Sequence, residues 1–215
     1  MNSGEQPSVP LRDLYVEQLR YDASRLIWLA YTNMVAGAFR QSEEDDITDE
    51  IVARINLIKE DPQAPEWVER YEVHEQRRKR VGSARGKSRP IIDIEIEPNR
   101  RGVRPRLGFE AKRLGAGHTV RKYLGPDGLG AFVCGHYPMT HGEAGMIAYI
   151  QQRTVSEWTD KISRELKRAS AKHSAIEPCE LQRCLEVDDF QLYRTRHTDT
   201  LGNSVLVVHL LLDLA

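Results

Sequence analysis

The sequence predicts an α/β protein in which helices flank a central mixed β-sheet. Two patterns along the chain support this prediction. Apolar residues recur at helical spacing over residues 10–58, and the period changes to two at residues 91–97, where isoleucines alternate with acidic residues. Segments that favour helices or strands continue towards the C-terminus. We therefore expect an acidic helical segment at residues 1–61 and a core that contains the sheet at residues 62–215.

Composition is that of an ordinary globular protein. Of the 215 residues, 40% are apolar and 29% are charged. The three cysteines, Cys134, Cys179 and Cys184, are too few for a disulfide framework, so we expect a reducing, cytoplasmic environment. The most apolar early run, residues 26–39, is shorter than the roughly 20 residues of a membrane span. No basic segment precedes an apolar run near the N-terminus, so neither a membrane anchor nor a secretory signal is expected.

Two helices are expected in the acidic segment. Apolar side chains recur near helical spacing over residues 10–39, which is typical of a helix with one buried face. Ser42 is a good N-cap for a second helix, because the acidic run at 43–46 would then interact favourably with the helix dipole. This helix is expected to end at Asp61, because the residue before a proline disfavours helical geometry.

A further helix and a β-hairpin are expected in the basic middle of the chain. Pro65 is a favourable first residue for a helix that runs into residues 76–80. A loop at 82–87 separates this helix from two strands, at 91–97 and 106–114, in which polar and apolar residues alternate. A short basic turn joins the two strands, so we expect them to pair as neighbours.

The rest of the chain is expected to form shorter elements. They are a short helix at 118–124, a strand at 129–134, longer helices at 143–153 and 156–173, and strands at 190–197 and 205–212. The Gly202-Asn203 turn favours a hairpin between the last two strands. His197 and His209 fall in that hairpin, and we expect hydrogen-bonded sheet histidines there rather than catalytic groups.

The formal net charge of −1 conceals an uneven distribution of charge. Residues 1–75 contain 7 Lys/Arg and 16 Asp/Glu, whereas residues 76–122 contain 15 Lys/Arg and 4 Asp/Glu. A basic block within a neutral protein is a candidate binding surface for a polyanion such as a nucleic acid. The alternative is a solvated basic loop that pairs with the acidic N-terminal third.

Asp93, Glu110 and Lys112 are the residues most suited to chemistry. Asp93 and Glu110 lie on the two strands of the predicted hairpin, and Glu110 and Lys112 are two positions apart, so their side chains share a face. Burying these charges uncompensated would be costly. Mg²⁺, with Mn²⁺ as a substitute, would compensate them, because Mg²⁺ binds through one or two carboxylates plus substrate phosphate oxygens. Lys112 would then orient a water or stabilise developing charge.

Two alternatives for these acids remain open. Glu95 and Glu97 share the face of Asp93, so either of them could be the ligand in its place. The acidic face could also be the solvated face of an edge strand, cross-paired with Lys112 and Arg113.

The runs RPIIDI at residues 89–94 and GFEAKRL at residues 108–114 resemble the PD-(D/E)XK nuclease superfamily. The motif of that superfamily is an acidic residue on one strand and (D/E)-x-K on the next. The resemblance implies a restriction-endonuclease-like fold, with Asp93 and Glu110 as metal ligands and Lys112 as the catalytic lysine. In one departure from the usual pattern, the proline lies three positions before the aspartate instead of beside it.

Family members often add a glutamate from the helix before the sheet. Here Glu75 is the first choice for that catalytic and metal-binding role, and Glu72 is the second. The motif-level resemblance covers about residues 72–150, with a weaker likeness to residue 215. Later runs are similar to small standalone nucleases of bacterial antiviral defence loci, which implies an effector in such a system.

The expected activity is Mg²⁺-dependent cleavage of phosphodiester bonds by an endonuclease, with DNA favoured over RNA as substrate. The alternative is a non-catalytic nucleic-acid-binding or scaffold subunit of a defence complex with the same fold. The acidic N-terminal helices could shield the basic face, or bind a partner or second subunit. The residues expected to contact phosphates are Arg77, Arg78, Lys79, Arg80, Arg85, Lys87, Arg89, Arg100, Arg101, Arg104, Arg106 and Arg113.

Overall fold

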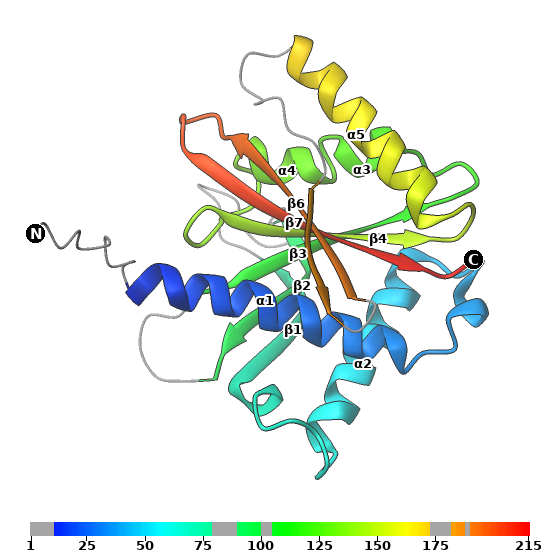
Figure 1. Cartoon of the computed structure of the whole chain (residues 1–215), viewed down its shortest axis with the longest axis vertical. Coiled ribbons are helices and arrows are strands. Elements are labelled where there is room, and N and C mark those ends of the chain that lie inside the picture. The colour runs from blue at the N-terminus through cyan, green and yellow to red at the C-terminus, as the bar shows by residue number, and fades with distance from the viewer. Residues whose placement is uncertain (1–10, 79–89, 100–104, 173–181, 188–189) are drawn as a thin grey trace, which may run out of the picture.

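The centre of the computed structural model is a seven-stranded mixed β-sheet with the order β1-β2-β3-β4-β7-β6-β5 (Figure 1). Its strands are β1 Tyr71–Arg78, β2 Ile91–Pro98, β3 Leu107–Leu114, β4 Glu143–Ile150, β5 Gln182–Val187, β6 Phe190–Thr198 and β7 Ser204–Asp213. The central pairs β3–β4 and β4–β7 are parallel, and the outer pairs are antiparallel. The structure describes residues 11–78, 90–99, 105–172, 182–187 and 190–215.

Helices form a layer on each face of the sheet (Figure 1). They are α1 Leu11–Thr32, α2 Glu44–Glu60, α3 Val120–Leu124, α4 Leu129–Val133 and α5 Val155–Lys172, with the 3₁₀ helices η1 Ala36–Phe39 and η2 Val68–Arg70. The helices α1 and α2 pack in one hydrophobic cluster with β2 and β3, whereas α3, α4 and α5 pack in another with β4 and β7. The acidic N-terminal segment therefore supplies one of the two helical layers.

Because side chains alternate along each strand, the sheet packs against both helical layers. On β4, Ile147 and Tyr149 are buried towards α1 and α2, whereas Met146 and Ala148 are buried towards the other helices. A strand that is covered on both faces needs apolar residues at nearly every position. Close packing within the sheet also requires a glycine at position 145, because a Cβ atom there would lie 2.1 Å from a ring carbon of Phe109 on β3.

Several sequence predictions are confirmed. The structure contains the two N-terminal helices, the β2–β3 hairpin, the short helix α3, the long helix α5 and the closing β6–β7 hairpin. The two hairpin histidines are buried and hydrogen-bonded as expected, because the Thr195 hydroxyl lies 2.7 Å from Nε2 of His197 and 2.8 Å from Nε2 of His209. Among the described residues, no helix combines the length and apolar character that crossing a membrane requires.

Other predictions are wrong. The expected helix from Pro65 into residues 76–80 is the short turn η2 followed by strand β1. The expected strand at 129–134 is helix α4, and the expected helix at 143–153 is strand β4. Glu43, rather than Ser42, occupies the N-cap position of α2. A continuous apolar run such as that of β4 lacks the alternation that separates a strand from a helix, so only its place at the centre of the sheet decides its structure.

Candidate active site

The candidate site lies where β2 and β3 separate. Their antiparallel ladder pairs Ile94 with Phe109, and continuing this register by one position places Asp93 opposite Glu110. The Asp93 carboxylate bridges the two strands there, because its Oδ2 accepts a hydrogen bond of 2.7 Å from the backbone N–H of Ala111. Asp93 and Glu110 therefore meet on one face of the sheet, as the sequence predicted.

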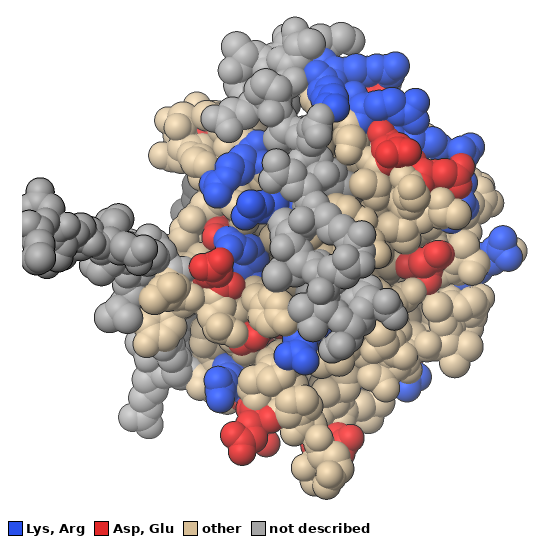
Figure 2. All heavy atoms as spheres, in the orientation of Figure 1, with Lys and Arg blue, Asp and Glu red and all other residues tan. Residues whose placement is uncertain are grey.

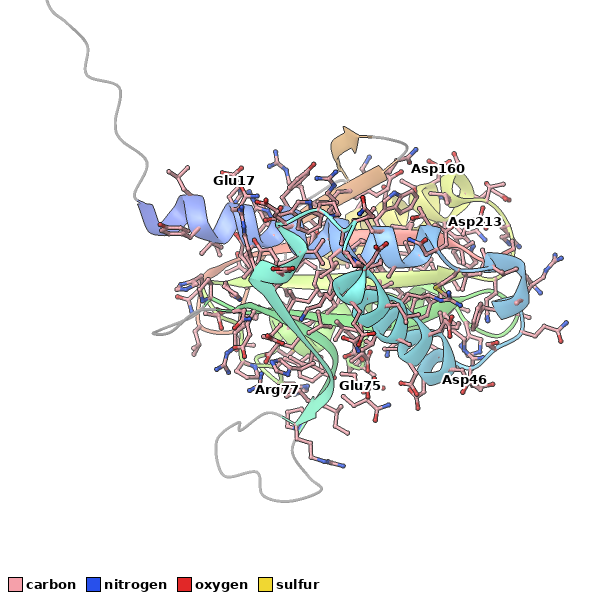
Figure 3. The ribbon with its side chains drawn as sticks, turned by 90° about the horizontal axis from the view of Figure 1, so that it is seen from below. Glu17, Asp46, Glu75, Arg77, Asp160 and Asp213 are labelled. Atoms are coloured by element: carbon pink, nitrogen blue, oxygen red, sulfur yellow. The ribbon has the colours of Figure 1, made fainter. Side chains whose placement is uncertain are left out.

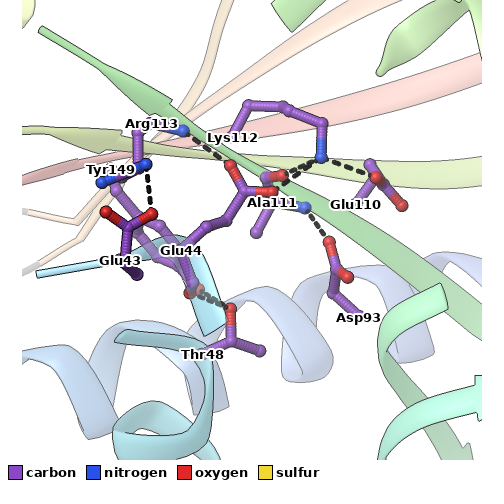
Figure 4. A network of polar contacts seen from close by, with 9 residues as sticks. All are labelled: Glu43, Glu44, Thr48, Asp93, Glu110, Ala111, Lys112, Arg113 and Tyr149. Carbon is purple, nitrogen blue, oxygen red and sulfur yellow. Dashed lines mark hydrogen bonds and ion pairs between the residues drawn. The ribbon is translucent and has the colours of Figure 1, made fainter. Parts of the chain in front are cut away.

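Lys112 lies at the centre of this cluster (Figure 4). Its Nζ donates hydrogen bonds to Glu110 Oε1 at 2.7 Å, to Glu44 Oε1 at 2.8 Å and to the carbonyl oxygen of Ala111 at 2.7 Å. These three acceptors match the three donors of an ammonium group. The side chain of Lys112 is 15% exposed and that of Glu110 is 6% exposed, so this charged contact is largely buried.

Glu44 is a site residue that sequence reasoning missed. It is the first residue of α2, and its second oxygen accepts a hydrogen bond of 3.1 Å from the backbone N–H of Arg113. The Arg113 guanidinium in turn contacts Glu43 at 2.5 Å and the carbonyl oxygen of Ser42 at 3.1 Å. These contacts attach the start of α2 to the far end of β3. The acidic run at 43–46 is the feature of the sequence that could have indicated this role, but a favourable interaction with the helix dipole explains the same run.

The two facing carboxyl groups have raised pKa values. Burial raises the pKa of Asp93 to about 6, against the opposing effects of the Ala111 N–H and Lys112. Burial and the charge of Asp93 raise the pKa of Glu110 to about 7, although Lys112 opposes this. Burial alone would lower the pKa of Lys112, but Glu110 and Glu44 raise it well above its usual value. Lys112 is therefore a cation throughout the accessible pH range, and the two acids share an excess of negative charge.

This excess of charge fits a divalent cation. Three carboxyl groups, those of Glu44, Asp93 and Glu110, surround a single ammonium. Among the described residues, Glu110 Oε2 is a buried oxygen with no well-formed hydrogen bond, although the Tyr137 hydroxyl lies close enough to lower the pKa of Glu110. The same part of the chain holds no group of three or more His, Cys, Asp or Glu side chains arranged to hold a metal. Asp93 and Glu110 would therefore be the two protein ligands, a number that suits Mg²⁺ because this ion completes its shell with water and phosphate oxygens.

Glu75 and Glu72 do not join the cluster. Both lie on β1 instead of a helix, and β1 is separated from β3 by β2. Glu75 is exposed and pairs in register with Ile94, so it lies on the face opposite to Asp93; Figure 3 labels it near Arg77 on the same strand. Glu72 lies 3.5 Å from Lys59 of α2. The expected helical glutamate is thus absent at both positions, and Glu44 is the glutamate that a helix brings to the cluster.

Glu95 and Glu97 belong to a separate network of ion pairs. Glu95 contacts Arg77 at 2.7 Å, and Glu97 contacts Arg106 at 2.7 Å. Burial would raise the pKa of Glu97, but a hydrogen bond from His74 and the nearby arginines lower it. Both acids are buried on a strand with neighbours on each side, so the solvated edge-strand interpretation is wrong. Of the three acids on this face, Asp93 is the one that meets Glu110.

The residues predicted to contact phosphates have divergent surroundings. Arg77, Arg106 and Arg113 form ion pairs with glutamates. The side chain of Arg78 is exposed. The remaining eight lie outside the described residues: Lys79, Arg80, Arg85, Lys87, Arg89, Arg100, Arg101 and Arg104. The basic block between residues 76 and 122 is thus partly neutralised by acids of the sheet.

A pocket of about 840 Å³ opens beside Lys112. Its lining includes Arg113, Arg121 and Lys122, so four basic side chains face this space together with Glu43, Glu44 and Asp127. Tyr137 lies next to Glu110, so burial and the charge of Glu110 raise the pKa of its hydroxyl, and its hydrogen bond to Glu110 lowers the pKa of that acid. The pocket therefore reaches the candidate site at Lys112 and Glu44, and its four basic side chains outnumber its three acidic ones.

Comparisons of the chain with protein-family models, with curated proteins and with solved structures found no match. The assignment of the candidate site consequently depends on its own geometry and chemistry.

Proposed function

We propose that this protein is a metal-dependent nuclease that hydrolyses phosphodiester bonds with Mg²⁺. The observation that supports this proposal most directly is the convergence of Asp93, Glu110 and Lys112 at the end of the β2–β3 ladder. The two acids carry more negative charge than the lysine compensates, and a pocket in which basic side chains outnumber acidic ones opens beside Lys112. Such an arrangement is costly for a purely structural role and is suited to a cation and a phosphate.

In this proposal each residue has a distinct role. Asp93 and Glu110 would hold the ion, which when bound would polarise the scissile phosphate and lower the pKa of an attacking water. Lys112 would present its ammonium to the phosphate or to that water. Glu44 would act as a positioning residue, because its hydrogen bond restrains Lys112 Nζ while Glu110 engages the ion.

Nucleic acid is the substrate class that this site favours, because four basic side chains line the pocket beside Lys112 and outnumber its three acids. The purified protein should be incubated with single- and double-stranded DNA and RNA, with Mg²⁺, Mn²⁺ or a chelator. Cleavage of DNA that requires the metal is the expected result. Preferential cleavage of RNA would mean that RNA, rather than DNA, is the substrate. The proposed roles of the site residues would then stay the same.

Conservative variants test the assigned residues. Asp93→Asn, Glu110→Gln and Lys112→Met should each lower cleavage at least a hundredfold while the fold is retained. Glu75→Gln is a matched control, because it removes the charge of an exposed glutamate on the same sheet but outside the cluster. Unchanged cleavage in Glu110→Gln would contradict the proposal.

One observation favours the alternative of a non-catalytic nucleic-acid-binding subunit. Lys112 already forms ion pairs with Glu110 and Glu44, so it neutralises part of the acidic charge without a metal. The double variant Glu110→Ala with Lys112→Ala separates the two functions. An enzyme would lose cleavage and keep binding, whereas a binding subunit would have no metal-dependent cleavage to lose. Phage challenge of cells that express either form would test the antiviral role that the sequence resemblance implies.

A further inference from the structure

A second basic hollow, of about 750 Å³, lies between α3 and α5. It shares His118, Thr119 and Arg121 with the pocket beside Lys112, so the two hollows adjoin. Arginine and lysine side chains dominate the charge of this second lining, since Glu165 is its single acid. The two hollows therefore connect α5 with Lys112 along a surface on which basic side chains outnumber acidic ones.

Helix α5 has one apolar face and one basic face. Trp158, Ile162 and Leu166 are buried against the sheet at intervals of four residues. Lys161, Arg164 and Arg168, which are three and four residues apart, line the hollow and share a strip of the helix surface that flanks the buried face. Figure 2 shows that Lys and Arg side chains gather over the region of α5.

The basic side chains of this hollow are only partly neutralised. Within the part of the chain that the structure describes, Arg121, Lys161 and Arg164 form no ion pair with a carboxylate. Arg153 lies 3.7 Å from Glu157, and Arg168 lies 2.7 Å from Glu165. Lys161 instead lies over the ring of Trp158, with its Nζ 4.4 Å from the ring centroid. The arginines of the β1–β2–β3 face differ, because buried glutamates hold them in ion pairs.

His118 and Arg121 lie at the junction of the two hollows, because both residues line each space. Burial lowers the pKa of His118, and Arg113 and Lys122 lower it further, whereas Glu44 and Glu43 oppose this effect. A polyanion that entered along α5 would therefore meet Arg121 at this junction before it reached Lys112.

We propose that the sugar–phosphate backbone of a nucleic acid lies in this groove between α3 and α5, which we call the α3–α5 groove, and extends from it to Lys112. The α3–α5 groove is defined by Arg121, Arg153, Lys161, Arg164 and Arg168. From Lys161 to Arg168 the helix rises about 10 Å, which is the axial length of about three nucleotide steps in a duplex strand. The contacts are to phosphates, so binding along this groove is independent of base sequence. This inference rests on the proposed nuclease function, because it assigns the path of that enzyme's substrate.

Binding measurements on a full-length protein without cleavage test the groove. Lys161→Gln, Arg164→Gln and Arg168→Gln are combined in a Glu110→Gln background, and affinity for a labelled DNA duplex is measured by fluorescence anisotropy in chelator. A matched control removes the same charge on the other helical layer, with Arg54→Gln, Lys59→Gln and Arg70→Gln. We expect the dissociation constant of the groove variant to rise at least tenfold, and that of the control to change less than threefold.

Salt dependence adds an independent readout. Loss of three phosphate contacts should reduce the slope of log affinity against log salt by about 3. Equal effects of the groove and control variants, or an unchanged slope, would overturn the inference even if the protein cleaves DNA. A selective loss of affinity in the groove variant would support the path even if wild-type protein proves not to cleave, so the two proposals can fail separately. Circular dichroism and thermal unfolding verify that both variants fold.

Discussion

Asp93→Asn is expected to stabilise the protein while abolishing its activity. Burial raises the pKa of Asp93 from 3.8 to about 6, which corresponds to about 3 kcal/mol of preference for the protonated form in the folded state. Because this pKa is raised, the protonated carboxyl group stabilises the folded state, fully so below about pH 3.8. This stabilisation is lost as the pH rises through about 6. At pH 8 the ionised carboxylate therefore makes the folded state less stable than a neutral side chain would.

The asparagine variant removes that charge and conserves the local geometry. Its side-chain oxygen can still accept the hydrogen bond from Ala111 that Asp93 accepts at 2.7 Å. Because Asp93 also attracts Lys112 and its pKa is coupled to that of Glu110, we expect a gain of about 1–3 kcal/mol in the free energy of unfolding at pH 8. For a chain of this length, the melting temperature should rise by about 2–10 °C.

Thermal and urea-induced unfolding at pH 4.5 and pH 8 provide the test. The gain should be large at pH 8 and small at pH 4.5, where the carboxyl group of the wild-type protein is protonated. Mg²⁺ should raise the melting temperature of the wild-type protein but not of the variant, because ligand binding stabilises only the form that holds it. Destabilisation of equal size at both pH values would refute the reasoning, since it would mean that Lys112 fully compensates the charge of Asp93. Glu75→Gln should change stability by less than about 0.5 kcal/mol at either pH.

Three further predictions concern the support of the site and the core. Glu44→Gln should lower the cleavage rate by roughly tenfold to a hundredfold with less effect on DNA affinity, because it loosens Lys112; kinetics in which only affinity changes would exclude this positioning role. Gly145→Ala should destabilise the fold by roughly 1–3 kcal/mol in urea unfolding, because its Cβ would overlap the Phe109 ring; an unchanged unfolding midpoint would show that the ring moves aside without cost. Burial and a neighbouring histidine lower the pKa of His209 to about 3, so its contribution to stability, complete above about pH 6.5, is lost as the pH falls towards that value. Replacing the histidine isolates this effect from that of the buried carboxyl groups: the free energy of unfolding of His209→Asn, taken relative to that of the wild-type protein, should rise by about 1–2 kcal/mol between pH 7.5 and pH 5, and a difference that does not change with pH would contradict this.

The sequence by itself determined the parts of the site that depend on local periodicity. Alternation along residues 91–97 and 106–114 identified two strands, and the spacing of Glu110 and Lys112 placed both side chains on one face. The expected pairing of these strands placed Asp93 and Glu110 on neighbouring strands, whereas the register that sets them opposite each other comes from the structure. Local chemistry was also sufficient to predict α2 and α5, whose apolar residues recur at helical spacing.

Only the tertiary structure decided which distant groups complete the site. Glu44 reaches Lys112 because α2 packs against β3, a contact between residues 68 positions apart that no local pattern reports. The strand β4 was mistaken for a helix because burial on both faces removes the alternation of polar and apolar residues. Within the described residues, the α3–α5 groove keeps three cations without an acidic partner, Arg121, Lys161 and Arg164, whereas Arg77 and Arg106 are paired. This difference likewise depends on which acids the fold places beside each side chain. Periodicity encodes which face a side chain occupies, whereas the neighbours that set its charge and pKa come from packing between elements far apart in the chain.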